Sequence, residues 1–251
     1  MIEEPFATGR GWIHRLDPTV KIIAGMILSM EIAVAERFST LTTAGLLAAL
    51  LILTARLPLA PVLKRLSVLA GFMLLMWGIL PLTYEGEPFH QYGPLIWTRP
   101  GIMLSTRITL KSVTILMIFM ALLSTMPIAA LGRGLNRLRV PDKLVFLFLM
   151  TYRYIFVMED EYRRLARAAK IRGFRPGTNL HSYQTYAYLI GMLFVRAKRR
   201  ADRVYQAMRC RGFSGKFHTI QTLQSNPALQ LIFSVAMLSA GVLLGGVEWV
   251  L

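Results

Sequence analysis

The chain has 251 residues, of which 55% are hydrophobic, and its 29 Lys and Arg against 13 Asp and Glu give a formal net charge of +16. An ordinary soluble domain is less apolar, and a nucleic-acid-binding protein does not need such long uncharged stretches. A single cysteine, Cys210, excludes an internal disulfide, and the four histidines have no metal-ligand spacing. The composition predicts an all-α integral membrane protein whose positive charge gathers on one side.

Five apolar segments are predicted to cross the membrane, which takes about 20 residues of helix. In chain order they cover residues 20–38, 39–55, 66–84, 112–132 and 227–248. The first is interrupted by charges, and the second is short. Asp17-Pro18 and Asn226-Pro227 each place a capping side chain before a proline, which predicts helix starts there.

The distribution of charge predicts the topology. Residues 131–226 carry 19 Lys and Arg against 5 Asp and Glu, which favours a cytoplasmic position. The loop at 84–100 is acidic and aromatic and is predicted to lie outside, although Arg99 nearby runs against the rule. We therefore predict four N-terminal transmembrane helices in 1–132, a cytoplasmic segment at 133–226, a last transmembrane helix in 227–251, and a cytoplasmic N-terminus.

The cytoplasmic segment is too long for a passive loop. Its apolar stretch 144–158 is predicted to be a helix buried against the spans. An amphipathic helix follows and ends at Gly173, and a second one covers roughly 181–211 before Gly212. The expected fold is thus about five transmembrane helices plus a long cytoplasmic segment with two amphipathic coupling helices.

A short basic phrase occurs twice in this segment, as ARAAKIRGF at 166–174 and YQAMRCRGF at 205–213. Arginine reaches carboxylates with a planar fork of donors, and glycine permits a left-handed turn and a close approach. We predict two docking points for an acidic, dimeric partner, against the alternative of plain helix-dipole or lipid-headgroup basicity. The predicted docking residues are Ala168, Lys170, Arg172, Gly173, Ala207, Arg209, Arg211 and Gly212.

Glu31 lies within the first predicted span, and a carboxylate at such a depth suggests a function. We expect a structural ion pair with Arg107 or Lys111, which share a helix face, rather than proton or ion handling. No convergent catalytic set and no GxxxxGK[ST] phosphate loop is found. We accordingly predict no catalytic residue, no metal ligand and no bound cofactor in this chain.

The paired phrases resemble those of the T component of energy-coupling-factor (ECF) transporters. Three stretches are similar to its cobalt branch, the CbiQ family: HRLDPTVK at 14–21, LNRLRVPDKLVFLFLMTYRYIFVMEDE at 135–161 and FVRAKRRADRVYQAMRCRGFSG at 194–215. The resemblance implies a non-catalytic scaffold in the plasma membrane of a prokaryote.

The same resemblance implies the partners. These are a dimer of ABC-type ATPase subunits that hold ATP and Mg²⁺, a membrane-embedded substrate-binding S component (CbiM-like) and a small accessory membrane subunit (CbiN-like), with no nucleic acid. By analogy Arg172 and Arg211 insert into the ATPases. Cobalt is the implied cargo. Nickel or a vitamin, or a conventional ABC-type permease that carries its own substrate, are the alternatives.

Overall fold

The computed structural model describes residues 11–85, 88–92, 95–215 and 227–250. The chain divides between Gly134 and Leu135 into two compact units. We call residues 11–134 with 227–250 the membrane unit, and residues 135–215 the two-helix unit. Each unit is described by itself.

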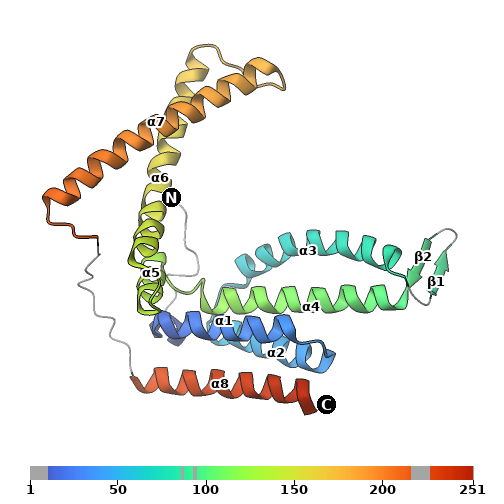
Figure 1. Cartoon of the computed structure of the whole chain (residues 1–251). Coiled ribbons are helices and arrows are strands. Elements are labelled where there is room, and N and C mark those ends of the chain that lie inside the picture. The colour runs from blue at the N-terminus through green and yellow to red at the C-terminus, as the bar shows by residue number, and fades with distance from the viewer. Residues whose placement is uncertain (1–10, 86–87, 93–94, 216–226, 251) are drawn as a thin grey trace. The chain divides into compact units, whose positions relative to one another are not determined.

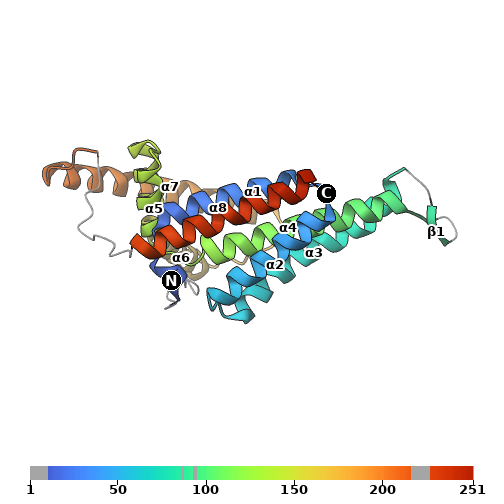
Figure 2. The ribbon, with the colours of Figure 1, turned by 90° about the horizontal axis from the view of Figure 1, so that it is seen from below.

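The membrane unit consists of helices that lie alongside one another (Figures 1 and 2). α4 packs against α1, α2 and α3, while α8 packs against α1 and α2. Their bounds are η1 Trp12–Arg15, α1 Pro18–Val34, α2 Phe38–Thr54, α3 Leu59–Thr83, α4 Arg99–Leu122 and α8 Pro227–Val250, and α5 Ile128–Arg137 follows α4 into the two-helix unit.

Three of these helices, α3, α4 and α8, are long and apolar enough to cross a membrane, and α2 is a shorter apolar helix. This confirms the all-α class and is compatible with five spans. The predicted span 112–132 is wrong in its limits, because α4 begins at Arg99 and ends at Leu122. Pro100 supplies a favourable first turn, and the chain breaks before α5 at residues 123–127. Arg107 and Lys111 consequently lie inside α4 rather than before a span.

A hairpin of two antiparallel strands precedes α4. β1 Pro88–Tyr92 pairs with β2 Leu95–Thr98, and within the described ranges this is the one pair of strands. The sequence pattern predicts a loop over residues 84–100 and does not indicate these strands. Thr98 is buried, and its hydroxyl donates to the carbonyl oxygens of Pro81 at 3.2 Å and Tyr84 at 2.9 Å. The hairpin is thereby tied to the end of α3.

Small residues let the central helices approach closely. Ala44 and Ala48 of α2 are fully buried in the core. Gly101 of α4 lies against α3, where an added Cβ would meet the Cα of Pro81 at 2.7 Å and the carbonyl oxygen of Leu80 at 3.0 Å. Because both of these are backbone atoms, neither can move aside without shifting α3.

Two polar contacts join helices across the membrane unit. Lys21 is fully buried, and its amino group donates to the hydroxyl of Thr125 at 3.4 Å, at the break between α4 and α5. Glu248 near the end of α8 accepts hydrogen bonds from the backbone N–H of Glu36 at 2.9 Å and the hydroxyl of Thr40 at 2.7 Å. Glu36 directly precedes Arg37, the N-cap of α2, and Thr40 lies in the first turn, so Glu248 ties the end of α8 to the start of α2.

The two-helix unit contains α6 Asp142–Ile171 and α7 Leu180–Cys210. Residues 144–158 are not a separate helix, since α6 runs through them without interruption. Asn179 caps α7 by accepting from the backbone N–H of Ser182 at 2.9 Å, and the hydroxyl of Ser182 accepts from Gly177 N–H at 3.1 Å. These bonds build the turn that reverses the chain between the helices.

An ion pair holds α6 to α7. Glu161 of α6 is 7% exposed, and its carboxylate accepts a hydrogen bond from the Arg196 guanidinium of α7. Arg164 adds a second cation at 3.9 Å. The hydrogen bond from Arg196 holds the pKa of the Glu161 carboxyl below its usual range. Because this pair is partly shielded from water, it should contribute more to stability than a fully exposed ion pair does.

We expect Gly101→Ala to destabilise the membrane unit, because the new Cβ would overlap backbone atoms of α3. Overpacking of this kind costs about 1–3 kcal/mol. Gly78→Ala in α3 is the matched control, since nothing lies within 4 Å of its Cβ position and alanine favours helix. Thermal unfolding of the purified protein in detergent measures the difference. Equal melting temperatures for the two variants would show that α3 and α4 do not meet as closely as described.

We expect Glu161→Gln to lower the melting temperature at neutral pH, because the amide binds Arg196 more weakly. A lowered carboxyl pKa means that the stabilisation is present above the unfolded pKa and is lost as the pH falls through the folded one. The gap between the native chain and Glu161→Gln should therefore close below about pH 4. Asp202→Asn, which breaks an exposed Lys198–Asp202 pair of 2.7 Å, should have a smaller effect at either pH.

Candidate docking site at two arginine–glycine helix ends

The two copies of the repeated phrase end two long helices in the same way. α6 ends at Ile171 and α7 at Cys210, so Arg172 and Arg211 are the C-cap residues. The glycines that follow, Gly173 and Gly212, have φ of +83° and +79°. The left-handed turn predicted from the arginine–glycine pairs is therefore confirmed at both helix ends.

The hydrogen bonds at the two ends also match. In the first copy Phe174 N–H donates to the Ala169 carbonyl at 3.1 Å and Gly173 N–H to the Lys170 carbonyl at 3.0 Å. In the second, Phe213 and Gly212 donate at 3.0 Å to the corresponding carbonyls of Met208 and Arg209. This is the Schellman arrangement, which satisfies carbonyls left over at a helix end. The repeat in sequence is thus a repeat in backbone structure.

The predicted docking residues are available for contact, because all eight are exposed: Ala168, Lys170, Arg172, Gly173, Ala207, Arg209, Arg211 and Gly212. Among the described residues no ion pair involves Arg172 or Arg211. Both guanidinium groups therefore keep their donors free for carboxylates outside the described chain.

A phenylalanine follows each glycine and fixes the helix end to the other helix. The Phe174 ring lies 5.6 Å from that of Tyr186 in an edge-to-face contact. The Phe213 ring lies 5.3 Å from that of Phe146. The sequence interpretation missed this role, although both rings belong to the repeated phrase. Aromatic pairs of this kind stiffen the ends that carry the arginines.

A groove of about 500 Å³ lies beside the first helix end. Ala168 and Leu165 from α6 and Tyr188 from α7 contribute small or apolar walls, while Arg172 and Arg196 add positive charge. Arg196 is already paired with Glu161, which leaves Arg172 as the cation directed to a ligand. The arrangement suits a segment that presents a carboxylate next to apolar side chains. No group of three or more His, Cys, Asp or Glu with metal-binding geometry occurs in the described ranges.

The predicted ion pair of Glu31 with Arg107 or Lys111 is not formed. Lys111 donates instead to the carbonyl oxygen of Ala33 at 2.8 Å, at the end of α1. The Arg107 guanidinium lies over the ring of Phe38 at 5.5 Å. Glu31 faces α8, where a Cβ on Gly241 would lie 2.8 Å from the nearer carboxylate oxygen. Arg107 and Lys111 thus contact Phe38 and Ala33, while the Glu31 carboxylate lies against α8.

The chain is similar in sequence to known transport proteins. Residues 9–222 match the family described as cobalt transport protein, CbiQ. The chain is 31% identical over 218 residues to the energy-coupling factor transporter transmembrane protein EcfT of Heliobacterium modesticaldum, which covers 81% of this chain and 80% of that protein. It is 27% identical over 233 residues to EcfT of Listeria innocua, covering 86% and 85%. The cobalt transport protein CbiQ of Rhodobacter capsulatus is 32% identical over 127 residues, which are 49% of this chain and 52% of that protein.

The family match includes parts of both compact units and both arginine–glycine helix ends. With three helices apolar enough to cross a membrane, it agrees with a multi-pass membrane protein. The chain belongs to the CbiQ family of cobalt transport proteins.

Proposed function

We propose that this chain is the transmembrane T component of an ECF-type ABC importer for a transition-metal ion, most simply cobalt. It would couple ATP hydrolysis in a dimer of cytoplasmic ATPases to uptake through a separate membrane-embedded substrate-binding subunit. The observation that carries the proposal is the pair of equivalent, exposed arginine ends on α6 and α7. Relatives named as energy-coupling factor transmembrane proteins and as a cobalt transport protein support it.

The chain itself is proposed to be non-catalytic. ATP and Mg²⁺ would bind to the ATPase subunits, and the metal ion to the substrate-binding subunit, which we expect to be CbiM-like and accompanied by a small CbiN-like subunit. The cobalt assignment is supported by the family description and by the named Rhodobacter capsulatus relative. The proposed location is a prokaryotic plasma membrane, with the N-terminus and residues 133–226 in the cytoplasm.

The proposed mechanism uses the rigidity of the two ends. Each Schellman cap and its phenylalanine hold an arginine at the tip of a helix of 30 or 31 residues. Closure of an ATPase dimer would move the two docking points relative to each other, and α6 and α7 would move with them. The Glu161–Arg196 pair lies at the contact between these two helices. Two long helices can convert such closure into shear or rotation.

The first test replaces both arginines. We expect Arg172→Ala with Arg211→Ala to abolish metal uptake and to release the ATPases on purification from membranes. A charge-assisted hydrogen bond contributes about 1.5–3 kcal/mol, so loss of two should weaken association on the order of a hundredfold or more. Arg199→Ala with Arg203→Ala is the matched control, because it removes two exposed arginines of α7 outside the repeated phrase. Normal uptake by the first double variant would refute the proposal, as would equal losses in both.

The second test concerns the backbone. Replacement of Gly173 and Gly212 by alanine should weaken ATPase recovery, because a left-handed residue costs about 1–2 kcal/mol for a non-glycine side chain. Replacement of both by asparagine, which tolerates this conformation better, should retain more of the association. The amount of ATPase recovered per T component is the measurement. An identical recovery for the alanine and asparagine variants would mean that the left-handed turn is not needed for docking.

A further inference from the structure

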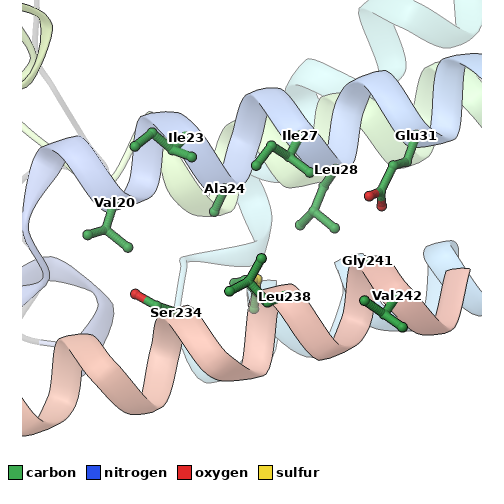
Figure 3. A pocket seen from close by; sticks show the side chains of 11 residues that line it. Val20, Ile23, Ala24, Ile27, Leu28, Glu31, Ser234, Leu238, Gly241 and Val242 are labelled. Atoms are coloured by element: carbon green, nitrogen blue, oxygen red, sulfur yellow. The ribbon is translucent and has the colours of Figure 1, made fainter. Parts of the chain in front are cut away.

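An apolar groove of about 250 Å³ runs between α1 and α8 in the membrane unit (Figure 3). Val20 and Ile27 of α1 face Leu238 and Val242 of α8 across it, and Ser234 and Glu31 add polar groups. Both helices run in the same direction (Figure 1). The groove is therefore a strip of apolar surface along two apolar helices, with a carboxylate near the end of α1.

α8 is attached to the rest of the membrane unit near both of its ends. Near its start, Phe233 is 2% exposed and its ring meets that of Trp12 at 5.9 Å in an edge-to-face contact. Near its other end, Glu248 binds Thr40 at 2.7 Å and Glu36 N–H at 2.9 Å. Between these two attachments α8 packs against α1, and the groove lies along this contact.

Glu31 is the feature that selects an occupant. Oxygen Oε2 of Glu31 is buried and accepts no hydrogen bond from any described residue. Gly241 makes room for the carboxylate, since a Cβ there would lie 2.8 Å from Oε1. Lys111 and Arg107, the partners predicted from the sequence, are directed to Ala33 and Phe38. The described residues thus supply the acceptor but no donor for Oε2.

A buried carboxylate oxygen without a donor in an apolar groove is costly, and such groups are normally paired. A hydrogen-bond donor that binds in an apolar groove must belong to a molecule or segment that is otherwise apolar. Acyl chains of lipids carry no donor, whereas a transmembrane helix presents apolar side chains and one polar group together. A polar side chain on a helix commonly forms hydrogen bonds across a helix–helix contact in lipid.

We propose that the α1–α8 groove is a docking site for a transmembrane helix of a partner subunit, with a hydrogen-bond donor on that helix bound to Glu31. The partner is identified by its chemistry: an apolar helix with one donating side chain, such as Lys, Arg, Asn or Ser, at the depth of Glu31. The site lies in the membrane unit and does not involve the arginine–glycine helix ends. It rests on the proposed assembly with another membrane subunit, but not on the ATPase-docking role of those ends.

The test is photo-crosslinking in the complete complex in native membranes. Benzoylphenylalanine replaces Val242, which lines the groove, or Leu243, its exposed neighbour outside the groove lining. The adducts are identified by mass spectrometry of the crosslinked peptide. A peptide from a transmembrane helix of another subunit, with a donor residue in it and formed from position 242 in clear excess over 243, is the expected result. An adduct with lipid only, or with a second copy of this chain, would overturn the proposal.

Variants of Glu31 test the donor. Glu31→Leu should lower the crosslink yield from position 242 about tenfold or more, as expected for loss of one hydrogen bond to a charged group. Glu31→Gln keeps an acceptor oxygen and should retain a substantial part of the yield. ATPase recovery, which reports on Arg172 and Arg211, should be normal in both variants, so failure at one site is distinguishable from failure at the other. An equal crosslink yield for the native chain and Glu31→Leu would refute the role of Glu31.

Discussion

A helix that ends must satisfy its last carbonyl groups, and the two-helix unit meets this constraint twice with one device. The N–H groups of Phe174 and Phe213 bond back to the carbonyls of Ala169 and Met208 across a left-handed glycine. The turn can form only where a residue tolerates positive φ. Everything distinctive about the candidate site follows from it, because the turn places an arginine at the helix tip and turns a phenylalanine back onto the other helix.

The membrane unit combines largely apolar helices with a few polar contacts between them. Its helices are apolar and expose much of their surface, as expected for a protein surrounded by lipid. A few polar groups then decide how the helices are joined. Lys21 donates to Thr125 at the break between α4 and α5, and Glu248 at the end of α8 accepts from Glu36 N–H just before α2. Oε2 of Glu31 has no hydrogen-bond partner among the described residues, which leaves an acceptor available to a molecule outside the chain.

Each of the two units carries one proposed contact site, and the two sites lie in different environments. The proposed ATPase contact uses exposed guanidinium groups in water, where bidentate geometry supplies specificity. The proposed helix contact uses one acceptor in an apolar groove, where the cost of leaving it unpaired supplies specificity. A subunit that binds different partners through such different chemistry can lose one contact and keep the other.

Local patterns along the sequence were sufficient for the membrane class, for the ends of α6 and α7, and for the left-handed glycines, because these depend on composition, periodicity and neighbouring residues. They did not set the limits of α4, since Pro100 starts the helix well before its apolar stretch and residues 123–127 end it. Only the tertiary structure decided which way Glu31 faces, that Glu161 binds Arg196, and that Glu248 reaches Thr40. Those contacts join residues far apart in the chain, and the packing of whole helices fixes them rather than any local propensity.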